Sequence, residues 1–455
     1  MPDNGLVNFT QRYLVLDVNH SIYLSMKKVF ISILLSMVVC IAGMAQMTAT
    51  DSTHHHSAVV LTTEHNTQQQ SSYDVIKAMY EANGRHFQDP RAPRFLFLDR
   101  KGRVALGIGG YVKGTMSVGF GGIANNVDFV TAAIATPSQP DMRNQFRMDA
   151  STSRLFFKLV GRNSVVGDFT VYIESDFRGT GAGYYGMRLR QAYIQLWRFR
   201  AGRSWSTFCD VAAAPPTIDF QGPSGTVLTM NTMLQYTQPL GENWEMVMAV
   251  ETPSATYTTQ PHYNDAITQR VPDFPSYIQF KWDGGQSHIR LSNLLRMLSY
   301  RNLVADENKF TFCWATQLSG VIQASRHFTF YMQGVYGRGY GDYLNDLGGY
   351  GYDLIPGERN GSMVAPYALG LVGGVQYTIF PGLFLSAAYS QCRLYDEPSL
   401  SASAYRYGQY VVANAFYTPF PNCQIGIEYL YGTRHNYNDV SGSAHRINTM
   451  IQYNF

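Results

Sequence analysis

Residues 444–455 end the chain and read AHRINTMIQYNF. Two kinds of side chain alternate along this stretch. One face carries Ile447, Thr449, Ile451, Tyr453 and Phe455, and the other carries Arg446, Asn448, Met450, Gln452 and Asn454. Because successive side chains of a β-strand point to opposite faces, the period of two predicts a strand with one apolar and one polar face.

The same alternation recurs upstream, with charged residues on the polar face. In 166–178 one side carries Asp168, Thr170, Tyr172, Glu174 and Asp176, and the other carries Phe169, Val171, Ile173 and Phe177. A dry interior could not solvate such charges, so the pattern favours strands with lipid outside and water inside. A soluble β-sandwich also alternates, so this pattern does not decide the fold alone.

From residue 103 onward, sixteen stretches have strand length, alternation and β-branched or aromatic content. They are 103–120, 145–161, 166–178, 186–199, 200–208, 227–239, 243–253, 276–283, 287–300, 309–324, 327–340, 363–379, 383–395, 405–419, 422–435 and 444–455. Every second connection is tight, as at 162–165 and 284–286, whereas those between are longer on the whole, as at 121–144 and 209–226. Outer-membrane barrels have short periplasmic turns and longer external loops. The alternation therefore predicts an all-β, 16-stranded antiparallel transmembrane β-barrel.

Aromatic residues and the last residue agree with this interpretation. Trp197, Trp244 and Phe420 lie at tight turns, where amphipathic rings would form a girdle at the lipid headgroups. Phe455 ends an alternating strand, as in the signal that outer-membrane insertion machinery reads. An even number of strands places both chain ends on the short-turn side.

Composition excludes several classes. The 455 residues are 14% aromatic and 15% charged, the opposite of a disordered chain. Beyond the N-terminus no run of about 18 uncharged apolar residues exists, which excludes a helical membrane protein. The formal net charge of +3 predicts no nucleic-acid partner. Cys209, Cys313, Cys392 and Cys423 lack CxxC spacing and predict no zinc site.

The N-terminus predicts export. Residues 26–45 combine two lysines, a short apolar core and a small-residue site, which indicates a Sec signal peptide cleaved before Gln46. Residues 1–25 precede this signal and indicate an over-extended start. Residues 46–95 form a polar periplasmic N-terminal segment, with a short helix expected over 73–87. A His tract such as 54–56 can bind metal, but in so polar a context a disordered tail is favoured. The barrel would occupy 96–455.

The third long connection, 209–226, differs in composition from the others because it is rich in proline and small apolar residues. Such a segment suits packing against a wall better than exposure to solvent. We expect it to enter the lumen as a constriction loop, with Asp210 and Asp219 at the passage. An external cap or a trimer contact is the alternative.

Two motifs carry a resemblance to a known family. The stretch 202–208 (GRSWSTF), with Thr217-Ile218-Asp219-Phe220 and Gly222-Pro223, resembles the signature of DcaP-like outer-membrane porins, and so does 107–114 (GIGGYVKG). The resemblance covers about 95–455, and a weaker one exists to phosphate-selective porins. It implies a homotrimeric channel for small anionic solutes such as dicarboxylates. The coiled coil that often precedes the barrel in this family lacks heptads here.

Anion preference requires cations in the lumen, because charged rings and the local field set selectivity. The candidates on polar faces are Lys113, Arg154, Lys158, Arg188, Arg190, Arg203, Arg290 and Arg296. Arg203 ranks first, because it precedes the expected constriction loop and a guanidinium binds a carboxylate through two hydrogen bonds. The alternative for each is a wall salt bridge, above all to Glu174 or Asp176.

No motif supports catalysis or a cofactor. GxSxG, HExxH and GK[ST] are all absent from the sequence. The sequence therefore predicts a non-enzymatic porin in the Gram-negative outer membrane, surrounded by lipid, that passes small anionic solutes by passive diffusion. A plugged fatty-acid-type transporter of hydrophobic substrates and an outer-membrane enzyme stay as alternatives.

Overall fold

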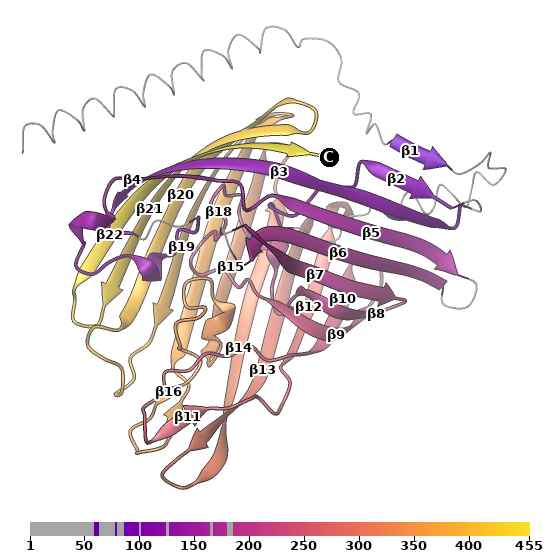
Figure 1. Ribbon diagram of the computed structural model, residues 1–455. Coiled ribbons are helices and arrows are strands. Elements are labelled where there is room, and N and C mark those ends of the chain that lie inside the picture. Colours follow the sequence, from indigo (N-terminus) through magenta and orange to yellow (C-terminus); the bar gives the residue numbers. More distant parts are fainter. Residues whose placement is uncertain are drawn as a thin grey trace, which may run out of the picture. The chain divides into compact units, whose positions relative to one another are not determined.

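The computed structural model describes residues 59–62, 78–79, 86–99, 102–123, 127–163, 167–179 and 185–455 (Figure 1). The expected signal peptide, the segment before it and the His tract lie outside these residues. Of the helix expected over 73–87, residues 78–79 are described and helical, and 86–87 are described and not helical. Among the described residues, no helix is long and apolar enough to cross a membrane.

The chain folds into a closed antiparallel barrel of 16 strands, as predicted. In chain order the wall consists of β3 (Val104–Gly121), β4 (Gln145–Asp149) continued by β5 (Arg154–Asn163), β6 (Gly167–Gly179), β7 (Gly186–Leu196), β8 (Phe199–Trp205), β9 (Met230–Pro239), β10 (Trp244–Glu251), β12 (Phe274–Trp282), β13 (Ser287–Asn302), β14 (Glu307–Gln323), β15 (Phe328–Arg338), β18 (Tyr367–Phe380), β19 (Leu383–Leu394), β20 (Tyr405–Phe420), β21 (Cys423–Asn436) and β22 (Ser441–Asn454). The barrel closes because β22 pairs with β3, and the backbones of Phe455 and Gly110 exchange two hydrogen bonds (Figure 1).

The predicted strand 145–161 is interrupted, and the break has a local cause. The Asp149 carboxylate accepts hydrogen bonds from the backbone N–H and the hydroxyl of Ser151, which turns the chain between β4 and β5. Both pieces still pair with β3, so they act as one wall strand.

Several short elements were not predicted. They are β1 (Val59–Thr62), β2 (Phe95–Leu98), β11 (Asn264–Ala266), β16 (Ile355–Pro356), β17 (Met363–Val364) and the 3-10 helices η1 (Thr131–Ala133), η2 (Pro140–Met142), η3 (Val211–Ala213), η4 (Asp283–Gly285) and η5 (Gly341–Tyr343). β2 pairs with the first half of β3, and β1 pairs with β2 (Figure 1). β1 and β2 therefore extend the sheet along the first half of β3, on the edge where β22 pairs only with the second half.

The two faces of the wall differ as predicted. Leu234 on β9 is 53% exposed on the outside, whereas its neighbour Gln235 is buried on the inside. On β14, exposed Leu318 alternates in the same way with buried Gln317. Apolar side chains outside and amides inside suit a barrel with lipid around it and water within it.

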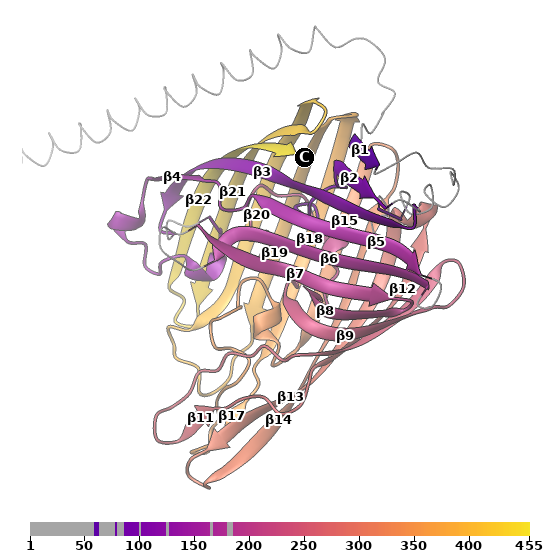
Figure 2. The same cartoon turned by 45° about the vertical axis from the view of Figure 1, so that its right-hand side comes forward.

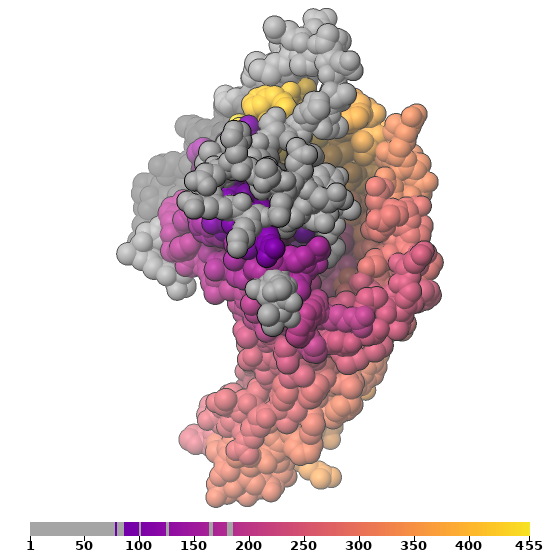
Figure 3. Space-filling model, turned by 90° about the vertical axis from the view of Figure 1, so that its right-hand side faces the viewer, coloured from indigo at the N-terminus to yellow at the C-terminus, as the bar shows by residue number. Residues whose placement is uncertain are grey.

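The two rims also differ. The turns after β7, β18 and β20 are tight, whereas the connections from β8 to β9 and from β15 to β18 are long. At the long-loop rim β13 and β14 pair as far as Asn302 and Glu307 and project beyond the neighbouring wall (Figures 2 and 3). The described cysteines Cys209, Cys313, Cys392 and Cys423 are free and buried.

Candidate channel site

The connection between β8 and β9 runs through the inside of the barrel. Most of its residues from 206 to 227 are buried. Its first residues, Ser206 and Thr207, donate hydrogen bonds to Glu251 at the end of β10, and contacts with β13 and β14 follow at Asp210. The Asp210 carboxylate lies 2.8 Å from Nε2 of His288 and accepts a hydrogen bond of 2.6 Å from the hydroxyl of Ser319. This part of the loop is therefore fixed to inward polar side chains of the wall.

The middle of the loop is fixed to the opposite wall by a carboxylate on β21. Glu428 accepts hydrogen bonds from the backbone N–H groups of Ile218 and Asp219 at 2.7 and 2.8 Å. It also accepts one from the side chain of Asn414 on β20, which donates to the carbonyl of Pro216 as well. A buried carboxylate with backbone donors is a strong anchor, because charge-assisted hydrogen bonds exceed neutral ones.

The loop leaves the interior past β18 and β19, and glycine is required there. The N–H of Gly225 donates to the hydroxyl of Ser390 at 2.8 Å. A Cβ at position 225 would lie 2.5 Å from the carbonyl oxygen of Gln391 and 2.7 Å from the backbone nitrogen of Leu371. No side chain fits this close approach of two backbones.

The two loop carboxyls differ electrostatically. Burial and then the neighbouring Glu428 raise the pKa of Asp219 to about 7. For Asp210, burial alone would raise the pKa, but Arg290 and His288 together hold it well below its ordinary value. Asp219 therefore titrates near neutral pH while Asp210 stays ionised.

We expect the seating of the loop to depend on pH through Asp219. Because its pKa is raised in the folded state, the stabilisation is complete at acid pH and is lost as pH rises through about 7. Single-channel conductance and current noise should therefore rise between about pH 5.5 and 8.5. Asp219→Asn should flatten this profile, whereas Asp210→Asn should keep it. An unchanged slope in Asp219→Asn would contradict the assignment.

Four arginines surround one aromatic ring of the loop. The guanidinium carbons of Arg154, Arg178, Arg188 and Arg190 lie 5.9, 4.2, 5.9 and 5.6 Å from the centre of the Phe220 ring. These residues come from β5, β6 and β7, so the loop tip faces the wall at this cluster. We call these four side chains the arginine cluster.

Carboxylates pair with the arginine cluster, and two of them, Glu174 and Asp176, are fully buried in the wall. Arg190 contacts Glu174 at 2.8 Å, and Arg188 contacts Asp176 at 2.5 Å. The Arg188 side chain is 40% exposed, whereas that of Asp176 is 0% exposed. The salt bridges that the sequence left as an alternative are thus present. Arg188 reaches the water, whereas the side chain of Arg190 is only 6% exposed.

The remaining predicted cations lie in different surroundings. Nζ of Lys113 donates to the carbonyl of Ile218 at 3.2 Å, and Nζ of Lys158 donates to the carbonyls of Ala78 and Met79. Nη1 of Arg290 donates to the carbonyl of Cys209 at 3.0 Å and lies 3.9 Å from Asp210. All three support segments inside the barrel.

Arg296 and Arg203 lie elsewhere. Arg296 is enclosed beneath the external loops, where it contacts Asp273 and Asp353. Arg203 pairs in register with Thr232, on the face opposite Ser204. It lines a cavity of about 480 Å³, together with Arg188 and Trp205, where β7 separates from β8.

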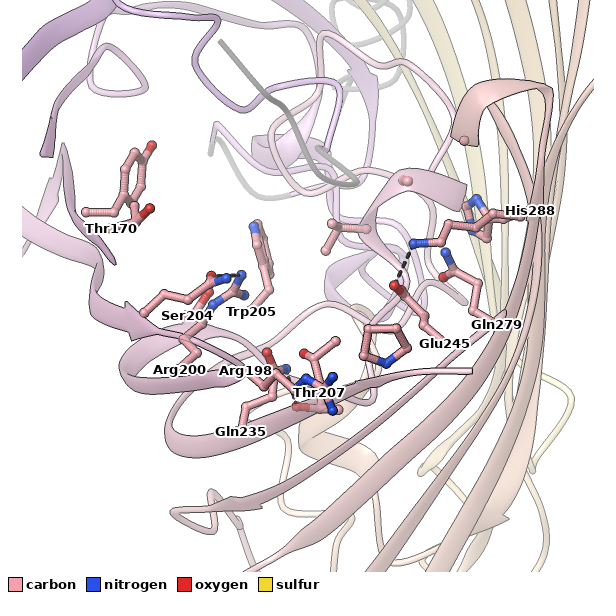
Figure 4. A pocket seen from close by; sticks show the side chains of 18 of the residues that line it. Thr170, Arg198, Arg200, Ser204, Trp205, Thr207, Gln235, Glu245, Gln279 and His288 are labelled. Carbon is pink, nitrogen blue, oxygen red and sulfur yellow. Dashed lines mark hydrogen bonds and ion pairs between the residues drawn. The ribbon is translucent and has the colours of Figure 1, made fainter. Parts of the chain in front are cut away.

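A larger cavity of about 1660 Å³, which we call the vestibule, lies on the short-turn side of the loop. Figure 4 shows Arg200, Ser204 and Trp205 on one side of it and Glu245, Gln279 and His288 on the other. Tyrosines and glutamines from neighbouring strands also line it, so the surface is polar and aromatic.

Arg200 is a lining cation that the sequence analysis did not single out. Its guanidinium carbon lies 4.7 Å from the centre of the Tyr193 ring, and it donates a hydrogen bond to Gln195. Its Nε is buried and has no hydrogen-bond partner in the described part of the chain. The alternation of β8 was its only sequence signal. Within the described residues, no group of three or more metal-ligating side chains exists.

The family model of the porin subfamily matches residues 103–454. The outer membrane channel DcaP of Acinetobacter baumannii is similar in structure, with a TM-score of 0.68 and 22% identity over 78% of this chain and 98% of that one. OmpT of Vibrio cholerae has a TM-score of 0.48 and 10% identity over 77% and 98% of the two chains. OmpF of Salmonella typhi has a TM-score of 0.48 and 12% identity, also over 77% and 98%. No curated protein matches the chain.

The matched region contains every wall strand, and the loop 209–226 packs into the polar interior of the barrel. Family membership assigns the chain to channels and not to enzymes. The chain therefore belongs to the porin subfamily and is a passive diffusion channel of the Gram-negative outer membrane with a DcaP-like fold.

Proposed function

We propose that this porin passes small, preferentially anionic, dicarboxylate-like solutes, and that the loop 209–226 and the arginine cluster form its constriction. The observation that carries the proposal is the arrangement of the ion pairs. The carboxylate of Asp176 is buried in the wall, whereas the guanidinium of Arg188, which pairs with it, reaches the water. A solute beside Arg188 is then nearer to the positive than to the negative end of this pair, which favours anions.

The vestibule supports the same proposal. Arg200 and Arg290 both line it, and Arg200 forms no ion pair with a described carboxylate. A guanidinium without a carboxylate partner in the protein is suited to binding the carboxylate of a solute. An anion that enters from the short-turn side would therefore meet a cation before it reaches the arginine cluster.

Ion current through the purified protein in a planar bilayer under a KCl gradient tests the proposal. We expect an anion-selective reversal potential, with conductance steps in triplets if the protein is a homotrimer. Arg200→Gln should lower the anion-to-cation permeability ratio by a factor of about 2, because it removes the unpaired cation.

Arg406→Gln is the matched control, because Arg406 pairs with exposed Asp439 at the external rim. Its reversal potential should equal that of the wild type. Cation selectivity of the wild type would overturn the proposed anion preference, and absence of current would overturn the constriction as described.

A further inference from the structure

Residues 86–90 (HFQDP) precede every wall strand, yet they lie inside the barrel. His86 and Gln88 are 8% and 7% exposed. The ring of Phe87 packs edge-on against Phe416 of β20, with 4.9 Å between ring centres, and lies 6.0 Å from the ring of Phe384. An apolar side chain thus fixes the segment to the wall opposite the arginine cluster.

The segment also binds the middle of the inserted loop. Nε2 of Gln88 donates to the carbonyl of Asp219 at 2.7 Å and to that of Thr217 at 3.4 Å. The carbonyl of Gln88 accepts a hydrogen bond of 3.0 Å from the hydroxyl of Tyr111 on β3. Residues more than a hundred positions apart in the sequence therefore form one layer across the lumen.

Asp89 reaches from this layer to the arginine cluster. Its Oδ1 accepts a hydrogen bond of 3.0 Å from Arg154, and its Oδ2 accepts one of 3.3 Å from Nε1 of Trp205. The ring of His86 lies 6.0 Å from that of Trp205. Burial, and then Arg154 and Arg190, lower the pKa of His86 to about 3, so the ring of His86 is uncharged at neutral pH.

Trp205 lines both the vestibule and the cavity of about 480 Å³ that Arg203 lines, so both spaces border its ring. We propose that residues 86–90 form a second side of the constriction, beside the loop 209–226, and we call this segment the second jaw. We further propose that Asp89 is a specificity-determining residue, because its carboxylate opposes the positive field of the arginine cluster. This inference rests on the proposed function, since it names a further part of the same passage. It assigns the N-terminal segment a role in selecting solutes.

The sign of the effect follows from the charge. Asp89 adds a carboxylate beside Arg154, so the positive potential at the passage is weaker than the arginines alone would make it. Asp89→Asn keeps the size of the side chain and removes the charge. The anion-to-cation permeability ratio should therefore rise, and single-channel conductance should change little.

The experiment compares the full-length mature protein with two variants in planar bilayers. Asp89→Asn tests the charge, and deletion of 46–90 tests the jaw. We expect the deletion to raise single-channel conductance severalfold and to admit larger neutral sugars in liposome swelling. Deletion of 46–57 is the matched control, because it keeps β1 and residues 86–90 and should behave as the wild type.

Wild-type permeability ratios in Asp89→Asn overturn the role of Asp89, and wild-type conductance in the 46–90 deletion overturns the second jaw. If that deletion does not fold, Phe87→Ala with Gln88→Ala replaces it, since this pair removes the contacts with β20 and the loop and should also raise conductance. The wild-type current decides the proposed function separately. If the wild type is anion-selective and the variants behave as the wild type does, the proposed anion preference stands and the proposed role of residues 86–90 is wrong.

Discussion

Replacing Glu428 by alanine is expected to unseat the inserted loop and raise single-channel conductance severalfold. Glu428 is 1% exposed on β21 and accepts backbone hydrogen bonds from Ile218 and Asp219. Asn414 and Asn448 donate to the same carboxylate. Alanine would leave these donors buried without an acceptor, at a cost of about 1–3 kcal/mol for each unsatisfied group.

Two measurements check this expectation. Conductance in planar bilayers should rise, and liposome swelling should show entry of sugars that the wild type excludes. Glu245→Ala is the matched control, because Glu245 is a vestibule carboxylate paired with Lys281 and does not contact the loop. If Glu428→Ala conducts as the wild type does, the loop is not the element that narrows the passage.

The wall could be predicted from the sequence because its signal is local. The stretch 166–178 agrees with β6 to within one residue, since polar and apolar side chains alternate from Asp168 to Glu174. The break at Asp149 was missed because a side chain that caps a turn does not disturb the period of two. β2 has four residues, too few for a pattern, although its burial alternates.

The contacts of the loop could not be predicted, because they join distant residues. Composition indicated that 209–226 packs against a wall, but the partners of Ile218 and Pro216 lie 210 and 198 positions away. No spacing rule connects such residues. They become neighbours only when the barrel closes, so the constriction stays a proposal that Glu428→Ala tests.

The side on which an arginine lies depends on register, which the sequence of β8 leaves open. Gly202 has a φ of 127°, a backbone conformation that favours glycine, but the pairing of β8 with β7 and β9 continues through it without a shift. Arg200 and Arg203 are three residues apart, so alternation places them on opposite faces. Arg200 lines the vestibule, whereas Arg203 shares a face with Thr232. Salt bridges to Glu174 and Asp176 could be foreseen as an alternative, because the acids and bases occupy polar faces of adjacent strands.

Replacing Arg296 by alanine is expected to destabilise the external loops. The side chain of Arg296 on β13 is 0% exposed, and its Nε lies 3.0 Å from a carboxylate oxygen of Asp273. Its Nη1 lies 3.1 Å from Asp353 and donates to the carbonyl of Gly339 at 2.7 Å. One guanidinium thus joins the connection before β12 to the connection after β15. Removing one member of a buried ion pair costs about 3–5 kcal/mol, since the partner is left as an uncompensated charge.

This cost should appear as a lower temperature at which the folded barrel loses its fast migration in SDS gels, and as faster cleavage of the external loops by added protease. Arg301→Ala is the matched control, because Arg301 lies on the same strand but pairs with Asp306, whose side chain is 89% exposed. An exposed pair of this kind contributes about 0–1 kcal/mol, so Arg301→Ala should stay near the wild type. The reversal potential separates the two roles of Arg296. If Arg296 is a buried anchor, Arg296→Ala leaves the reversal potential unchanged while stability falls. If Arg296 is a pore-lining cation, the reversal potential shifts while stability is unchanged, and Arg296 would then belong to the residues that line the passage.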